Sequence, residues 1–430
     1  MALLSGSALE QSARRRIALR LLPFLWLVYV VAFLDRVNVA YAALEMSHDL
    51  GFSDQVFGLG AGIFFIGYVL LEIPGVLIVE RWSARRWLAR IMISWGIMTA
   101  LVGFVHTPRQ FYAARCLLGA AEAGFFPGVI VYLTHWFCRR DLAKAVASFM
   151  AAQPLSNLVG SPLAGRILRI HWYGLPGWRW LFILEGVPAV VLGFITFFYL
   201  TDWPSQASWL PPEEREWISS ELSREIKEKT ALHSYTIAQA LRQREVILLT
   251  VIYFLGATGI YGFSLWLPTI LKRASGFSTG IVTLLVTLPY LAALAATLLN
   301  GWHSDHTGER RWHAAGPLLL ASAALLLAII FSSHLWMQLG FFTLFAGSLY
   351  GYQPCFWPLP TITLSQSAAA VAIGMINSLG NLGGFAGPFL VGYLVTRSGN
   401  FNSGLVCLLL TLLSAAVLVL CLRGVSSTDR

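Results

Sequence analysis

The chain consists largely of apolar runs that are each long enough to cross a lipid bilayer, and this feature constrains the fold more than any other. A transmembrane helix needs about 20 consecutive, mostly apolar residues. Only 12% of the residues are charged and 57% are hydrophobic, whereas a water-soluble domain has about 25% charged residues. Twelve such runs are found, at 20–42, 56–79, 87–106, 110–136, 143–168, 179–201, 244–271, 279–300, 315–333, 336–360, 366–396 and 402–422.

The pattern within these runs predicts helices. A strand of an outer-membrane barrel shows about ten residues of alternating polarity, and this alternation is missing from the runs. A helix satisfies all of its backbone hydrogen bonds within one segment, which the bilayer requires. We therefore expect an all-α membrane protein with twelve transmembrane helices.

The distribution of basic residues predicts the orientation of the chain. Cytoplasmic loops are enriched in Lys and Arg, and with the N-terminus inside, 21 of the 30 basic residues fall on the cytoplasmic side and seven on the other. The first run has full span length and lacks a prompt small-residue cleavage site, so we expect it to remain as the first helix. We expect a multi-pass protein of the cell (inner) membrane with both termini in the cytoplasm. The net charge of +9 reflects the same bias, so nucleic acid is not an expected partner.

One long polar stretch divides the chain in the middle. It covers residues 202–243, and within it Pro211 and Pro212 are followed by acidic residues, which is a good helix start. We expect a six-helix bundle at 1–201, a cytoplasmic loop and helix at 202–243, and a second, pseudo-symmetric six-helix bundle at 244–430. The polar stretch is too short to form a catalytic domain, so the chain is not expected to be an enzyme.

The two halves carry similar loops after their second spans. The sequence GVLIVERWSARR covers residues 75–86, and GWHSDHTGERR covers 301–311. In both, a Gly allows close helix approach, and an acid meets basic residues in a short turn on the cytoplasmic side. Ion pairs there can hold a transporter-like bundle closed and release it when the halves rock apart. The predicted gating residues are Glu80, Arg81, Arg85 and Arg86 in the first loop, and Asp305, Arg310 and Arg311 in the second.

These loops carry a family resemblance. Gly301, Asp305, Gly308, Arg310 and Arg311 resemble the G-x-x-x-D-x-x-G-x-R-R signature of the major facilitator superfamily. In the first copy an acid stands one place later than usual. The resemblance covers essentially the whole chain, and it implies the twelve-helix major facilitator fold and transport by alternating access.

Charged residues at membrane depth are costly and are therefore candidates for function. Arg115 and Glu122 are seven residues apart and share one helix face. Asp35 and Arg36 are adjacent, so one packing points Arg36 at Glu122 or at a substrate and Asp35 at a neighbouring helix. The alternative is that the two Arg residues and two acids only neutralise each other and hold helices together. Two more acids within spans, Glu72 and Glu185, are interpreted as structural.

Four segments resemble the anion:cation symporter branch of the superfamily, which includes bacterial permeases for sugar acids, tartrate, phthalate and hydroxyphenylacetate. They are FLDRVNVAYA (33–42), GYVLLEIPG (67–75), RCLLGAAEAGFFPG (115–128) and MINSLGNLGGFAGP (375–388). The resemblance implies that Asp35 and Glu122 carry protons and that Arg36 faces an anionic substrate. It also implies substrate-binding roles for Arg115, Tyr68, Gln153, Trp357 and Asn381. Phe33 replaces a Tyr that is common in sugar-acid permeases, which favours the tartrate, phthalate or hydroxyphenylacetate subgroup.

Two spans contain clusters of helix-breaking residues. Six Gly and Pro residues lie between Gly374 and Pro388, and three Gly residues precede Trp266-Leu-Pro268. Such residues permit close packing or bending during alternating access. They are compatible with a cavity between the halves.

The expected function is proton-coupled symport that imports a small organic anion. The runner-up is a drug:proton antiporter of the same fold, since NLVGSPLAG (157–165) partly resembles an exporter motif, although Arg36 and Arg115 disfavour cationic drugs. A sensor or membrane enzyme is a third possibility, but a nucleophile–base set, a metal cluster and a phosphate loop are all missing from the sequence. We expect no cofactor and no metal. The expected partners are the anion, protons and the lipid bilayer, with the protein acting as a monomer.

Overall fold

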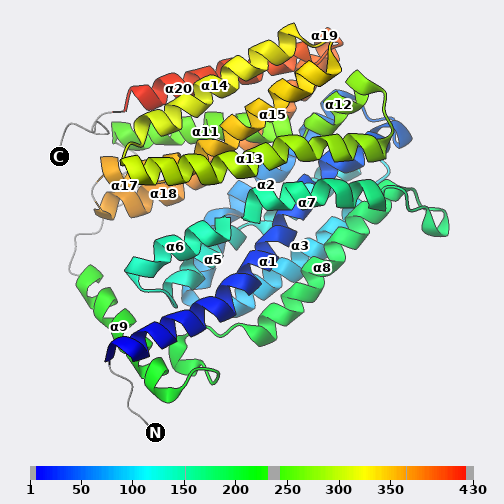
Figure 1. Cartoon of the computed structure of the whole chain (residues 1–430). Coiled ribbons are helices and arrows are strands. Elements are labelled where there is room, and N and C mark those ends of the chain that lie inside the picture. Colours follow the sequence, from blue (N-terminus) through cyan, green and yellow to red (C-terminus); the bar gives the residue numbers. More distant parts are fainter. Residues whose placement is uncertain (1–5, 151, 231–242, 365, 423–430) are drawn as a thin grey trace.

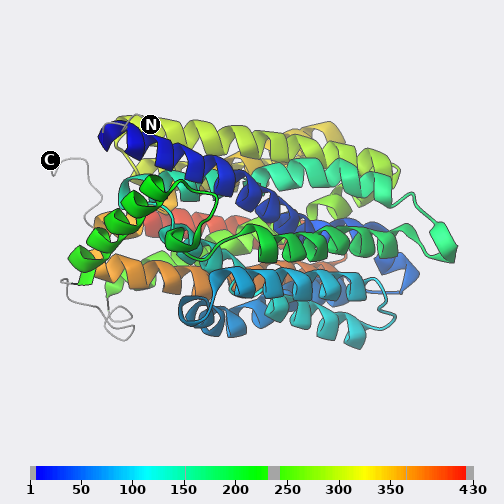
Figure 2. The ribbon, with the colours of Figure 1, turned by 90° about the horizontal axis from the view of Figure 1, so that it is seen from below.

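The computed structural model describes residues 6–150, 152–230, 243–364 and 366–422. Within these ranges the chain forms long helices joined by short connections, and no strand is found. The helices lie side by side along one axis, and both chain ends lie at the same end of that axis (Figures 1 and 2). We call this end the terminal side and the opposite end the far side. The protein therefore has the expected all-α membrane fold.

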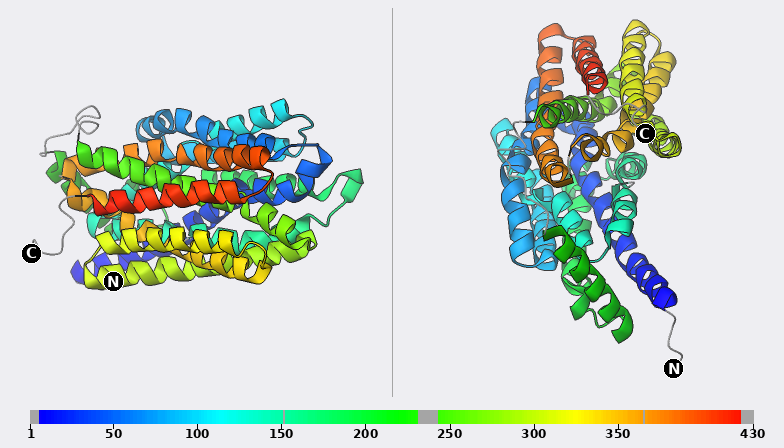
Figure 3. Two further views of the ribbon diagram at one scale, coloured as in Figure 1. Left: turned by 90° about the horizontal axis from the view of Figure 1, so that it is seen from above. Right: turned by 90° about the vertical axis from the view of Figure 1, so that its left-hand side faces the viewer.

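The first bundle comprises the helices before the central polar stretch. Viewed along the helices, it occupies the lower part of the molecule in Figure 3. Its elements are α1 (Gly6–Asp49), α2 (Asp54–Arg81), α3 (Ala84–Val102), α4 (Pro108–Glu122), α5 (Phe125–Thr134), α6 (Arg139–Met150), α7 (Ala152–Ile167), the 3-10 turn η1 (Trp172–Gly174), α8 (Gly177–Tyr199) and the 3-10 turn η2 (Pro204–Gln206).

The second bundle lies above the first in the same view. Between the two comes α9 (Pro212–Thr230), the helix expected from the paired prolines. The elements of the second bundle are α11 (Arg244–Ser264), α12 (Leu267–Ser275), α13 (Thr279–Thr307), α14 (Arg311–Ile330), α15 (Leu335–Gly351), α16 (Gln353–Phe356), α17 (Leu359–Thr363), α18 (Gln366–Gly380), α19 (Gly383–Ser398) and α20 (Asn402–Leu420).

The twelve predicted spans correspond to this set of helices. By length and composition, nine helical stretches of the described chain are suited to cross a membrane. The other three spans are α3, the pair α6 and α7, and the series α15 to α17. Helix α3 begins with three arginines within seven residues, and α15 is only 17 residues long before the chain bends into two short helices. Each of these covers the length of a predicted apolar run.

Helix breaks fall where glycine permits them. Helix α4 ends at Glu122, and Gly124 then adopts a left-handed backbone (φ 80°) before α5 begins. A side chain at that φ would be strained, so glycine is the residue that suits this kink. Gly75 of α2 approaches Gly124 so closely that an added Cβ would lie 3.2 Å from its Cα. The kink therefore places the end of α4 directly against α2.

The predicted breaks in the seventh and eleventh spans are also present. Helix α11 ends at Ser264 just before Pro268, and α18 ends at Gly380 with α19 beginning at Gly383. A Cβ on Gly380 would fall 2.1 Å from the ring of Tyr253, and one on Gly383 would fall 2.1 Å from the carbonyl oxygen of Phe254. Small residues thus bring the break in the eleventh span against α11.

The N-terminal part of α1 lies on the terminal side and contacts α9. Both Ser12 and Arg16 donate hydrogen bonds to the carboxylate of Glu214 on α9, at 2.8 and 3.1 Å. Arg14 binds Asp141 at the start of α6. Helix α9 is consequently attached to the first bundle (Figure 1).

The two bundles are sealed against each other on the far side. Arg273 donates to both carboxylate oxygens of Asp54, and the backbone N–H of Gln55 donates to the hydroxyl of Thr396 at 3.0 Å. On the other flank, Ser161 donates to the backbone carbonyl of Thr283. Helix α2 makes these contacts with α12 and α19, and α7 makes them with α13, so the described structure is closed on the far side.

Candidate functional site

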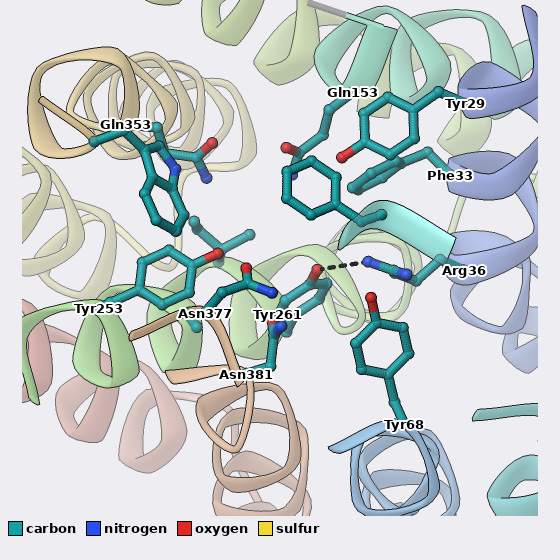
Figure 4. A pocket seen from close by; sticks show the side chains of 14 residues that line it. Tyr29, Phe33, Arg36, Tyr68, Gln153, Tyr253, Tyr261, Gln353, Asn377 and Asn381 are labelled. Atoms are coloured by element: carbon teal, nitrogen blue, oxygen red, sulfur yellow. Dashed lines mark hydrogen bonds between the residues drawn. The ribbon is translucent and has the colours of Figure 1, made fainter. Parts of the chain in front are cut away.

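A cavity lies between the two bundles, and its empty space, counted with the part open to solvent, is about 540 Å³. Figure 4 shows the side chains that line it. Its wall is aromatic and polar, and among its 14 lining residues only one is charged, Arg36. The remaining lining residues are Tyr29, Phe33, Tyr68, Phe126, Gln153, Tyr253, Ala257, Ile260, Tyr261, Gln353, Trp357, Asn377 and Asn381.

Helix periodicity explains how the wall is assembled. Tyr29, Phe33 and Arg36 are spaced by four and three residues, so they share one face of α1. Tyr253 and Tyr261 are two turns apart on α11, and Asn377 of α18 lies four residues before Asn381, which directly follows the end of that helix. The first bundle supplies the cation, and the second bundle supplies most of the amide groups.

Arg36 is held from both bundles. Its Nη2 donates to the Oε1 of Glu122 in the first bundle, and its Nη1 donates to the Tyr261 hydroxyl in the second at 3.4 Å. Its guanidinium carbon lies 5.0 Å from the centre of the Phe33 ring and 5.2 Å from that of the Tyr68 ring. Charge pairing and ring contact together fix the guanidinium at the cavity wall.

Asp35 points away from Arg36. Its Oδ2 accepts a hydrogen bond of 2.6 Å from the indole Nε1 of Trp95 on α3, and the residue is 1% exposed. This is the packing predicted from the sequence, in which the adjacent acid faces a neighbouring helix while the arginine faces Glu122. Asp35 does not line the cavity, and neither does Glu122, which is also 1% exposed.

The structure separates Arg115 from the other predicted substrate-binding residues. Arg36, Tyr68, Gln153, Trp357 and Asn381 all line the cavity, but Arg115 does not. It is fully buried between α4 and α2, where its Nε donates to the carbonyl of Gly60 at 3.4 Å. Seven residues along a helix correspond to about 10 Å, so Arg115 lies two turns from Glu122 toward the far side. Direct substrate contact by Arg115 is therefore not the geometry found here.

Several lining residues were not singled out from the sequence, namely Tyr29, Tyr253, Tyr261, Gln353 and Asn377. Tyr29 and Asn377 had a usable signal, because each lies at helical spacing from a predicted site residue. The others come from the second bundle, and their contact with the cavity depends on long-range packing. One further acid is connected to the wall: Glu72, interpreted above as structural, accepts a 2.6 Å hydrogen bond from the Nδ2 of Asn377.

The predicted gating loops lie on the terminal side. The side chains of Glu80 and Arg81 lie outside the described part of the chain. The backbone N–H of Arg85 donates to Asp202 at 2.9 Å, and Arg310 pairs with Asp305 at 2.5 Å. In the described residues of these loops, neither the Arg85–Asp202 pair nor the Arg310–Asp305 pair joins the two bundles. Arg86 is exposed, and the Nε of Arg311 is buried without a hydrogen-bond partner.

The glycines of the two signature loops lie at close helix contacts, as expected. A Cβ on Gly301 would lie 3.2 Å from the ring of Pro354, and Gly75 contacts the kink at Gly124.

Comparison with known proteins shows the family of this chain, because residues 25–388 match the Major Facilitator Superfamily. The chain belongs to this superfamily. It is accordingly a membrane transporter, not an enzyme.

The similarity to individual relatives extends over nearly the whole chain. A "Putative tartrate transporter" of Agrobacterium vitis is 45% identical over 418 residues, covering 97% of this chain and 96% of the relative. A "Quinolone resistance transporter" of Acinetobacter baumannii is 37% identical, covering 95% and 94%. The crystal structure of a bacterial homologue of the human lysosomal transporter Spinster superposes with a TM-score of 0.76 at 18% identity, covering 95% of this chain and 97% of that chain. That structural likeness shows the fold.

Proposed function

We propose that this transporter imports a small organic anion together with protons by alternating access. The observation that carries the proposal is the pairing of Arg36 with Glu122. Arg36 is the charged side chain among the described lining residues, and its partner is an acid that the cavity does not expose. A carboxylate substrate and Glu122 therefore compete for one guanidinium.

This competition supplies a coupling mechanism. When Glu122 binds a proton, its charge pair with Arg36 is lost, and the guanidinium is free to bind a substrate carboxylate with two parallel hydrogen bonds. When the proton leaves, the Glu122 carboxylate takes the arginine back and displaces the anion. Asp35 is the second proposed proton carrier. Coupling of this kind requires that the anion bind the protonated state more tightly than the deprotonated state.

The relatives support a carboxylate as the substrate. Tartrate and the quinolone drugs both carry a carboxylate group, and the relatives named for them are similar to this chain over more than nine-tenths of its length. We further propose a monomer of the inner membrane with both termini in the cytoplasm, which makes the far side the outer face. The proposed domain boundaries are 1–201, 202–243 and 244–430.

Reconstituted liposomes with an internal pH dye test this function. A panel of tartrate, hexonates, phthalate, hydroxyphenylacetate and allantoate is added outside, and symport is expected to acidify the lumen with at least one acid. Glu122→Gln is expected to abolish proton-driven accumulation while retaining some exchange of labelled anion for unlabelled anion. Uphill uptake by Glu122→Gln at the wild-type rate would rule out Glu122 as a proton carrier.

Drug:proton antiport is the second candidate, and the quinolone resistance relative favours it. The same liposomes separate the two functions by the sign of the pH change. Antiport of an added drug expels protons, so the lumen becomes alkaline, whereas symport of an added anion makes it acidic. Alkalinisation by a quinolone, without acidification by any acid of the panel, would replace the symport proposal.

A further inference from the structure

Glu72 connects the two bundles at the wall of the cavity. It lies on α2 one turn beyond Tyr68 and is 2% exposed. Its Oε1 accepts a hydrogen bond of 2.6 Å from the Nδ2 of Asn377 on α18. Glu72 also has a side-chain hydrogen bond with Ser378, the residue next to Asn377. The remaining hydrogen bonds described between the bundles belong to the far-side seal or to Arg36. Of these two partners of Glu72 on α18, Asn377 is the one that lines the cavity.

This bond fixes the orientation of an amide. An Asn side chain has a donor end and an acceptor end of nearly the same shape. A carboxylate only accepts hydrogen bonds, and in the structure the amide nitrogen of Asn377 faces Glu72 accordingly. The carbonyl Oδ1 of Asn377 is then the end left for the cavity, which this residue lines.

The cavity consequently offers two different polar groups to a ligand. Arg36, on the first bundle, donates hydrogen bonds and carries positive charge, which suits a carboxylate. The Oδ1 of Asn377, on the second bundle, accepts a hydrogen bond and therefore suits a donor such as a hydroxyl group (Figure 4). An unpaired polar group left facing a bound ligand costs free energy, so a ligand without the donor binds less tightly.

We infer that Glu72 is a positioning residue that orients the Asn377 amide and thereby selects hydroxylated carboxylates over their deoxy counterparts. This inference rests on the proposed function, because it presumes that Arg36 receives the carboxylate. It adds a substrate class, the hydroxy acids, and assigns its recognition to a residue pair that spans the two bundles.

Succinate, malate and tartrate test the inference, because these four-carbon diacids carry zero, one and two hydroxyl groups. Their dissociation constants are measured on the purified full-length protein by competition. The wild type is expected to bind malate about five- to tenfold more tightly than succinate, as one hydrogen bond to a neutral group predicts. In Glu72→Gln the new amide can donate or accept, so the orientation of Asn377 is no longer unique. The malate preference is expected to fall to about twofold or less, while succinate affinity stays within about twofold.

Two further variants make the result specific. Asn377→Leu removes the acceptor and should lose the same preference. Glu185→Gln changes another buried acid of the first bundle, on a helix that contributes no lining residue among those described, and it should keep the preference. Equal binding of malate and succinate by the wild type, or an unchanged preference in both Glu72→Gln and Asn377→Leu, would overturn the inference.

The inference and the proposed function can fail separately. If succinate and malate both acidify liposomes with equal affinity, proton-coupled anion transport stands and the role of Glu72 falls. If the wild type binds none of the three diacids, the hydroxy-acid inference is overturned, and the wider acid panel still decides the proposed function.

Discussion

The guanidinium of Arg36 and the carboxylate of Glu122 meet where the cavity wall ends and the protein interior begins. The Arg36 side chain is 11% exposed and that of Glu122 is 1% exposed. A ligand in the cavity can therefore contact the arginine but not the acid. In the proposed mechanism, the proton binds Glu122 and the anion binds Arg36. Each affects the binding of the other only through the charge pair between these two residues.

Arg36→Lys is expected to weaken anion binding by about ten- to hundredfold, in line with the loss of one or more charge-assisted hydrogen bonds. Lysine keeps the charge but cannot present two parallel donors to a carboxylate. The measurement is the dissociation constant of the transported acid on the purified protein. Arg90→Lys, at an exposed position on α3 outside the cavity, serves as the control and should bind normally. Wild-type affinity in Arg36→Lys would contradict contact between this side chain and the anion.

Trp95→Phe is expected to destabilise the fold by about 1–3 kcal/mol, because the buried Asp35 carboxyl group loses its 2.6 Å donor. Thermal unfolding in detergent measures the loss. The cost should be smaller in an Asp35→Asn background, since a neutral amide is less expensive to leave unpaired than a charged group. Trp302→Phe, at a position 64% exposed, is the matched control. Equal destabilisation by Trp95→Phe in both backgrounds would attribute the effect to ring packing alone.

Gly165→Leu is expected to stop transport while leaving the protein folded. A Cβ at Gly165 would lie 2.0 Å from the hydroxyl oxygen of Thr283 across the far-side seal, so a larger side chain holds the bundles apart there. Uptake in liposomes should fall at least tenfold, and a reagent added from the far side should label a cavity cysteine faster than in the parent protein. Gly340→Leu is the control, because a Cβ at Gly340 meets no described heavy atom within 4 Å. Normal uptake by Gly165→Leu would show that this contact is not part of the transport cycle.

Glu309 is expected to make stability depend on pH. Burial alone would raise the pKa of Glu309, but hydrogen bonds from the backbone of Trp312 and from His313 outweigh it and lower the pKa below its usual value. A lowered pKa means that the stabilisation is present above the ordinary Glu value of about 4.3 and is lost as pH falls through the lower folded value. Glu309→Gln should therefore cost about 1 kcal/mol at pH 7, as loss of a helix cap does.

The difference between wild type and Glu309→Gln should shrink as the pH is lowered below about 4. Melting temperatures at pH 7, 5 and 3.5 measure this trend. Glu213→Gln, at an exposed position on α9, should show no difference at any pH. A constant difference for Glu309→Gln across this range would attribute its effect to shape rather than to charge.

The spans and the α1 face of the site could be predicted because they depend on local pattern. Apolar run length marks each helix, and the spacing of Phe33 and Arg36 places both on one face regardless of what packs against it. The depth of Arg115 could not be predicted in this way. Its helix face was clear, but whether the cavity reaches two turns beyond Glu122 depends on how α2 packs through Gly60 and Gly67.

The second-bundle wall was the hardest part to predict. Tyr253, Gln353 and Asn377 approach Arg36 only because the two bundles dock in one register. That register is set by contacts distant in sequence, such as Gly392 of α19 against Asp54 and Gly58 of α2. The contact of Glu72 with the wall could not be predicted for the same reason, since its partner Asn377 lies 305 residues away.

The attachment of α9 to the start of α1 has a practical consequence. Because Ser12 and Arg16 both bind Glu214, we expect α9 to move together with the first bundle during the transport cycle. A fluorophore on the exposed side of α9 would therefore report the position of the first bundle. The distance from it to a second dye on α14 or α20 would then measure how the two bundles move relative to each other during the cycle.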